Sequence, residues 1–162
     1  MKYNCEEYIQ LLKSQQALKK QNKSLKTEDP IKYSKLRKYS ARISEYLHWS
    51  QKNEYLQLIK DFLNSKIDGK EFDNKFSKMV TVIEKKSRLL SKNYQELKCI
   101  EPSSMSLGFG TWISEIYLCC NEFYSDFNEE EDRIQIPFAK TEEQLRDAVK
   151  SLFPQIQKYC EE

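Results

Sequence analysis

The sequence is poor in the residues that interrupt helices and in those that build metal centres. Its 162 residues include three glycines and four prolines, whereas a β-rich fold needs many such turn residues. One histidine and five cysteines without CxxC spacing do not match the usual zinc-site patterns. The odd number of cysteines also argues against a disulfide framework. We therefore expect an all-α fold without a metal centre.

Long apolar segments are missing as well. No stretch approaches the roughly 18 consecutive apolar residues of a membrane-spanning helix. The first residues, MKYNCEE, lack the apolar run of a secretory signal. We therefore expect no membrane insertion, and a location in the cytoplasm or in the soluble compartment of an organelle.

Recognisable catalytic motifs are also absent. The sequence contains no GxSxG, HExxH, GxxxxGK[ST] or GxGxxG pattern, which are signatures of common hydrolases and nucleotide-binding enzymes. His48 lies between Leu47 and Trp49 without a second histidine to share a metal or a proton, so a packed or surface helical histidine is the simpler interpretation. We therefore expect a protein that is not an enzyme and needs no cofactor.

Charge, by contrast, is abundant and unevenly distributed. Charged residues make up 32% of the chain, against roughly 25% in an average globular protein. Residues 1–50 carry 11 Lys or Arg and 5 Asp or Glu, a net charge of +6, whereas residues 51–162 carry 16 and 20, a net charge of −4. Within residues 115–147 three basic residues face ten acidic ones. The chain thus has a basic N-terminal region and an acidic C-terminal region.

Apolar residues recur at helical spacing through the first 90 residues. The pattern predicts a loose helix over residues 4–26 and a second helix from Pro30, with no firm stop before residue 64. Asp68 and Glu71 then form the pattern of a capping box, in which each side chain satisfies a backbone N–H at a helix start. We therefore expect a tight elbow between two antiparallel helices at this point.

The pattern changes after residue 90. Residues 93–110 include two of the three glycines and predict a long irregular connection, whereas residues 111–124 again show helical spacing. Thr141 and Gln144 form a second capping box ahead of a last helix. Pro154 should either kink or end that helix, and Ile156 and Tyr159 suggest that it continues in some form.

Three blocks of the sequence resemble a known family. They are LIKDFLNSKIDGKEFDNKF (58–76), SEIYLCCNEFYSDFNEEEDR (114–133) and EEQLRDAVKSLF (142–153). With these blocks in this order, the region from about residue 53 to 159 resembles the colicin D immunity protein family, whose members inhibit a tRNA-cleaving toxin. The resemblance implies an antiparallel four-helix bundle in residues 53–162. Residues 1–52 have no counterpart in the family and are interpreted as a basic helical extension.

The resemblance also implies where such a protein would bind. Family members imitate the charge of tRNA and occupy the basic active-site cleft of the toxin with acids at the end of the third helix and just beyond it. Those positions fall here on Asn121, Tyr124 and Asp126, of which only Asp126 is acidic. Nearby carboxylates could substitute for the missing ones, namely Glu122, Glu129, Glu130, Glu131 and Asp132. These eight residues form the expected binding site for a protein partner with a basic surface.

Two other interpretations remain open at this stage. The run of acids is also typical of a solvated loop that precedes a helix, where negative charge suits the helix dipole. The basic region 1–52, with Tyr33, Tyr39 and Tyr46 among its lysines, could contact RNA or tether the chain as an accessory subunit of a larger complex.

Overall fold

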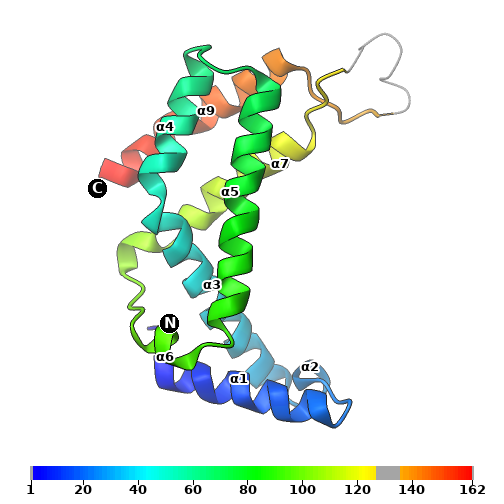
Figure 1. The fold of residues 1–162 in the computed structure, drawn as a ribbon, viewed down its shortest axis with the longest axis vertical. Coiled ribbons are helices and arrows are strands. Elements are labelled where there is room, and N and C mark those ends of the chain that lie inside the picture. The colour runs from blue at the N-terminus through cyan, green and yellow to red at the C-terminus, as the bar shows by residue number, and fades with distance from the viewer. Residues whose placement is uncertain (1, 127–135, 162) are drawn as a thin grey trace. The chain divides into compact units, whose positions relative to one another are not determined.

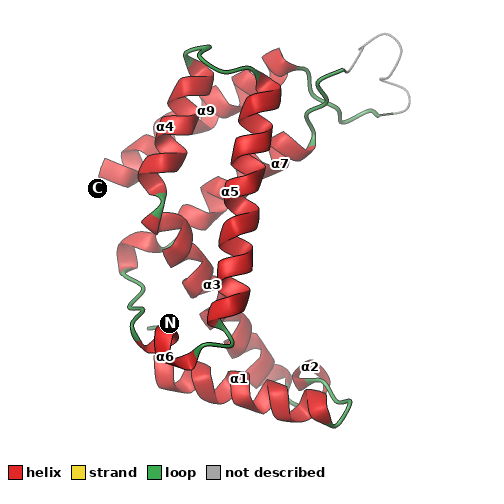
Figure 2. Ribbon diagram, in the orientation of Figure 1, coloured by secondary structure: helices red, strands yellow, loops and turns green. Residues whose placement is uncertain are grey.

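The structure, a computed structural model, describes residues 2–126 and 136–161, and its regular elements over these ranges are all helical (Figures 1 and 2). The eight α-helices of the described residues are α1 (Cys5–Lys20), α2 (Leu25–Glu28), α3 (Pro30–Ser50), α4 (Lys52–Leu63), α5 (Gly69–Leu90), α6 (Tyr94–Lys98), α7 (Phe109–Asn121) and α9 (Glu142–Glu161), with a short 3-10 turn at Ser104–Ser106. The expected all-α fold class is confirmed. None of the described helices combines the length and apolar character needed to span a bilayer.

The two predicted capping sites begin α5 and α9 as expected, but only one of them is a complete capping box. The N–H of Gln144 donates to Thr141 Oγ1 and the N–H of Thr141 donates to Gln144 Oε1, at 3.3 and 3.1 Å. At α5 the Asp68 carboxylate accepts from the N–H of Glu71 at 2.7 Å. The Glu71 carboxylate instead pairs with Lys75 one turn further on, at 2.6 Å. The reciprocal half of that predicted box is therefore replaced by an i,i+4 ion pair.

The middle of the chain departs from the predicted pattern at two points. The expected continuous helix is interrupted at Gln51, whose N–H donates to the carbonyl of His48 three residues earlier, and α4 begins directly afterwards. The connection expected to be irregular contains α6, which Asn93 caps by accepting from the N–H of Glu96. Toward the end of the chain, α9 continues past Pro154 to Glu161, so Pro154 does not end the helix.

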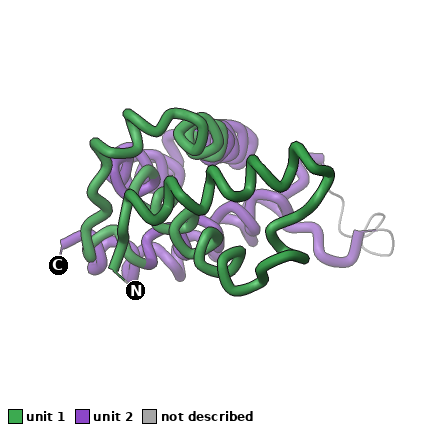
Figure 3. Tube along the Cα trace, turned by 90° about the horizontal axis from the view of Figure 1, so that it is seen from below, with its two compact units in different colours: residues 1–47, 83–107 green, residues 48–82, 108–162 purple. Residues whose placement is uncertain are grey.

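The chain forms two compact units, each built from two separate segments (Figure 3). Unit 1 consists of residues 1–47 and 83–107, and unit 2 of residues 48–82 and 108–162. The sequence-based division into 1–52 and 53–162 assigned residues 83–107 to the second domain, whereas they cluster here with the N-terminal residues. Helices α3 and α5 each contribute residues to both units.

Unit 1 has its own apolar core, to which α1 contributes four buried residues. The core consists of Tyr8, Ile9, Leu11, Leu12, Leu25, Leu36, Tyr39, Ile43, Leu47, Ile83, Leu90, Leu97 and Ile100. A polar contact joins α1 to α3, since the hydroxyl of Tyr39 donates to Glu7 Oε2 at 2.5 Å and the Lys35 ammonium pairs with the other oxygen. Burial, together with this carboxylate, raises the pKa of Tyr39 to about 12.

Unit 2 has a second core, drawn from α4, the first part of α5, α7 and α9. Its fully buried residues include Tyr55, Ile59, Phe62, Phe72, Phe76, Phe109, Ile113, Ile116, Leu145, Val149 and Ile156. Phe62 on α4 stacks on Phe72 of α5, with ring centroids 4.2 Å apart. Trp49 packs edge-on against Phe109 and Tyr159. Aromatic packing thus joins all the helices of this unit.

Candidate partner-binding site at the end of helix α7

Four of the expected binding residues lie within the described ranges, between the last turn of α7 and Asp126. α7 ends at Asn121, and Glu122 closes the helix by donating its N–H to the carbonyl of Leu118 at 3.1 Å. The N–H of Phe123 then donates to Cys120 at 3.0 Å. These bonds satisfy carbonyls that the helix end would otherwise leave without partners.

A short backbone bridge fixes this segment to the residues that precede α9. The N–H of Lys140 donates to the carbonyl of Glu122 at 2.6 Å, and the N–H of Tyr124 donates to the carbonyl of Lys140 at 3.2 Å. Phe123 and Lys140 therefore pair as in a parallel sheet, as an isolated bridge. The two hydrogen bonds thereby hold the backbone on both sides of Phe123, at Glu122 and at Tyr124.

Phe123 anchors the segment to the elbow between α4 and α5. A Cβ atom on Gly69, the first residue of α5, would lie 2.9 Å from the tip of the Phe123 ring. The N–H of Gly69 donates to Glu142 Oε2 at 2.9 Å. The absence of a side chain at residue 69 therefore lets both Phe123 and the first turn of α9 approach the start of α5.

The first turn of α9 also contacts the end of α4. The other oxygen of Glu142 pairs with Arg146 at 2.5 Å, and Arg146 in turn donates to the carbonyl of Phe62. The Arg146 guanidinium lies 4.1 Å from the centre of the Phe62 ring. Glu142 thus contacts the start of α5 and Arg146 the end of α4. These two helix ends form the elbow against which Phe123 packs.

The predicted carboxylates of this site differ in whether a cation of the chain already pairs with them. Glu122 Oε2 lies 2.9 Å from the ammonium of Lys140, and both side chains are partly exposed. Its negative charge is therefore shared with a neighbouring cation. Asp126 is exposed and forms no ion pair within residues 2–126 and 136–161. The remaining predicted acids, Glu129, Glu130, Glu131 and Asp132, lie outside the described residues.

Exposed apolar side chains accompany these polar groups. Asn121 is exposed, as is Tyr124, with 45% of its surface accessible. Leu118, one turn before Glu122, is 59% exposed, and Phe138, two residues before Lys140, is 79% exposed. The helical spacing of α7 could have indicated Leu118, because its solvent-facing positions Ser114 and Glu115 precede it by one turn. Phe138 had no such signal in the sequence.

The two neighbouring cysteines of α7 are not activated thiols. Cys120 is buried in the core and Cys119 is partly exposed, as adjacent helical positions require. Burial raises the pKa of both thiols. Because the thiolate is the reactive form, neither residue has the character of a nucleophile.

The net charges of the two units differ more than those of residues 1–50 and 51–162. Unit 1 carries 16 Lys or Arg and 8 Asp or Glu, a net charge of +8, whereas unit 2 carries 11 and 17, a net charge of −6. The candidate site thus belongs to the acidic unit. Such a charge steers oppositely charged partners toward a surface.

No family model, curated protein or solved structure matches this chain.

Proposed function

We propose that this chain is a non-catalytic binding protein whose acidic unit docks on a basic surface of a protein partner through the end of α7. The observation that carries this proposal is the combination of a fixed backbone at residues 122–124 with the exposed side chains of Tyr124 and Asp126. A surface that is ordered before binding loses little conformational entropy when it docks. Exposed aromatic side chains are common anchors of protein interfaces.

The resemblance to the colicin D immunity family suggests which partner to test. Under this proposal the partner is a tRNA-cleaving toxin domain, and α4, α5, α7 and α9 are the four helices of the immunity-type bundle. The shared core of these helices in unit 2 is consistent with that assignment. A nuclease that grips phosphates presents Lys and Arg in its cleft, so the net charge of −6 on unit 2 suits it.

The direct test measures inhibition and complex formation with a panel of purified tRNase toxin domains, that of colicin D among them. We expect one member to form a complex that weakens as salt rises. Tyr124→Ala should weaken the complex by about 2 kcal/mol, as expected for a central aromatic anchor. Neutralising Asp126 and the acids 129–132 should mainly slow association.

A matched control separates a specific site from general charge. Glu54 is an exposed acid on α4 of the same unit, so Glu54→Gln removes one charge away from the α7 end and should leave affinity nearly unchanged. The proposal fails if no toxin domain forms a salt-sensitive complex. It also fails if the Tyr124 and Asp126 variants bind as tightly as the unaltered chain.

A second function is favoured by the charge of unit 1. The net charge of +8 on a unit with its own core suits an accessory subunit of a larger, RNA-containing complex. Size-exclusion chromatography of a lysate distinguishes the two, because a free inhibitor elutes at a small size and a subunit co-elutes with a large assembly.

A further inference from the structure

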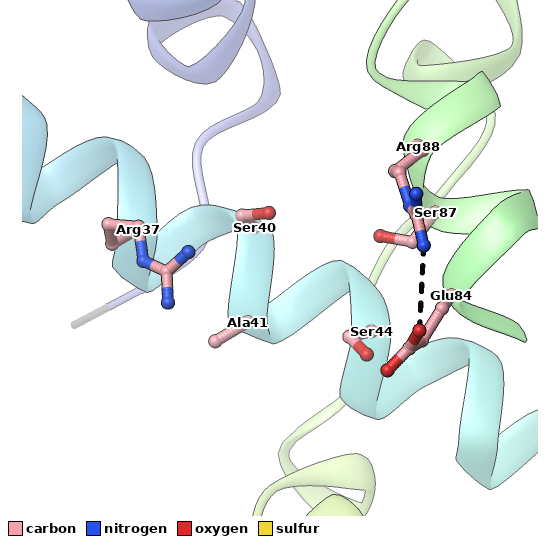
Figure 4. Close-up of a pocket in the computed structure, with 7 residues that line it drawn as sticks. All are labelled: Arg37, Ser40, Ala41, Ser44, Glu84, Ser87 and Arg88. Carbon is pink, nitrogen blue, oxygen red and sulfur yellow. Dashed lines mark ion pairs between the residues drawn. The ribbon is translucent and has the colours of Figure 1, made fainter. Parts of the chain in front are cut away.

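A groove in unit 1 lies between α3 and α5 and is distinct from the site at the end of α7 (Figure 4). Its volume is about 350 Å³, within the range of small-ligand sites. It is lined by Arg37, Ser40, Ala41 and Ser44 from α3 and by Glu84, Ser87 and Arg88 from α5. These positions recur every three or four residues, so one face of each helix lines the groove.

Two guanidinium groups flank the groove from opposite helices. Figure 4 shows Arg37 on α3 and Arg88 on α5, with the small side chains of Ser40, Ala41 and Ser44 along α3. Arg37 is exposed and has no ion-pair partner among the residues that the structure describes. Arg88 pairs with Glu84 at 3.5 Å, but their side chains are 78% and 55% exposed, and such pairs contribute little. Both cations are therefore available to a ligand.

Hydroxyl groups add further donors. Other helical serines bond to the preceding turn, since Ser14 donates to the carbonyl of Gln10 at 2.9 Å and Ser114 to that of Gly110 at 2.8 Å. Ser44 and Ser87, by contrast, have no side-chain hydrogen bond within the described ranges and line the groove. The groove thus combines unused hydroxyl donors with two guanidiniums.

We propose that this groove binds a phosphate group, supplied by a nucleic-acid strand. Arg forms paired hydrogen bonds to phosphate oxygens, and serine hydroxyls are common donors to the nucleic-acid backbone. A carboxylate offers only two oxygens to donors that approach from two helices, so an acidic peptide fits less well. This inference is independent of the docking site proposed for unit 2, and it names a specific RNA contact for the second function proposed above for unit 1. Loss of RNA binding in Arg37→Ala tests the groove alone, whereas co-elution with a large assembly tests the second function.

A neighbouring feature favours a strand over a free phosphate. A second cavity of about 180 Å³ shares Arg37 and Ser40 with the groove and is lined by Tyr33. An aromatic ring beside a phosphate site is the arrangement on which single-stranded bases stack.

The test measures binding of a fluorescently labelled 20-nucleotide single-stranded RNA over a range of salt concentrations. We expect Arg37→Ala and Arg88→Ala each to weaken binding by roughly tenfold. Each should also reduce the slope of log affinity against log salt by about 0.7, the value for one lost phosphate contact on a single strand. Glu84→Gln should strengthen binding, because it removes the one carboxylate of the groove and releases Arg88.

Controls separate a site from a generally basic surface. Lys20→Ala removes one exposed charge from α1, which contributes no residue to the groove, and should weaken RNA binding much less than Arg37→Ala. Arg37→Lys keeps the charge but loses the paired hydrogen bonds, so it should bind more weakly than the unaltered chain. Circular dichroism would verify that each variant remains folded.

Inorganic phosphate and a polyglutamate peptide are the other probes. Binding of inorganic phosphate alone, lost in Arg37→Ala, would support the phosphate site and assign it to a free phosphate compound rather than a strand. Three results would overturn the proposal. They are no binding of RNA or phosphate, an equal loss of affinity in Lys20→Ala, and tighter binding of polyglutamate than of RNA.

Discussion

His48 shows how burial sets the charge state of a single side chain. It is buried in unit 2, and its ring Nδ1 lies 3.0 Å from the hydroxyl of Tyr55. Burial lowers the pKa of His48 to about 4, from an ordinary value of 6.5. The imidazole is therefore neutral near pH 7. Of the packed and surface positions that the sequence left open for His48, the structure shows the packed one.

The shifted pKa predicts a loss of stability in mild acid. The unfolded chain takes up a proton at His48 below about pH 6.5, whereas the folded chain resists protonation until about pH 4. The contribution of neutral His48 is therefore complete above pH 6.5 and is lost as pH falls toward 4, by up to about 3 kcal/mol. Urea unfolding at a series of pH values measures it.

His48→Gln supplies the comparison, because glutamine keeps polar atoms beside Tyr55 but does not titrate. Its unfolding free energy should change less between pH 6.5 and pH 5 than that of the unaltered chain. Equal pH dependence in the two proteins would show that His48 does not titrate as its burial requires.

At the scale of elements, the start of α9 secures the elbow between α4 and α5. Glu142 accepts from the N–H of Gly69 and pairs with Arg146, which bonds to the end of α4. Glu142→Ala removes a side-chain cap from α5 and leaves Arg146 without its carboxylate. We expect the unfolding free energy to fall by about 1–2 kcal/mol, measured by chemical denaturation.

Glu143 offers a matched control for that substitution. It is the next residue in the same turn and is exposed, with no ion pair to a described residue. Glu143→Ala should therefore change stability by less than about 0.5 kcal/mol. If the two variants lost the same stability, general charge at the helix start would explain the effect in place of the contact with Gly69.

Capping residues in the sequence predicted where two of the helices begin. Asp68 and Thr141 were predicted as caps, and both begin helices as expected. The interruption at Gln51 was missed because glutamine is a good helix former, so its local propensity gives no sign of a break. α6 was missed because five residues carry too little periodicity to distinguish them from a loop.

The candidate site was predictable only in part, for a similar reason. Helical spacing predicted a helix over residues 111–124, whereas α7 runs from Phe109 to Asn121 and ends three residues earlier than expected. The pairing of Glu122 with Lys140 joins residues 18 positions apart, and nothing in their spacing indicates that they meet. The exposure of Phe138 likewise has no local signal in the sequence.

For the molecule as a whole, the segments of the two units alternate along the sequence, so no single cut in the chain separates one unit from the other. Ile83, Leu90, Leu97 and Ile100 follow the first segment of unit 2 in the sequence but are buried in the core of unit 1. The sequence pattern could not show this, because it assigns helices without saying which core each one joins. A cut near residue 50 therefore separates nine of the thirteen buried residues of the unit 1 core from the other four.

A chain truncated to residues 48–162 tests this division. We expect it to expose these four apolar side chains, each of which contributes about 1.5–3 kcal/mol when fully buried. It should bind a hydrophobic dye such as ANS and should associate in gel filtration, whereas the full chain should do neither. A monomeric truncated chain without dye binding would show that unit 2 folds independently of residues 1–47.

Both tryptophans of the sequence, Trp49 and Trp112, lie in unit 2, where Trp49 packs against Phe109 and Tyr159. Unit 1 contains none, although it is rich in tyrosine. Intrinsic emission excited at long wavelength therefore reports on one unit only, without any label. Differences between that emission and the ellipticity of the whole chain during denaturation would reveal whether the two units melt together.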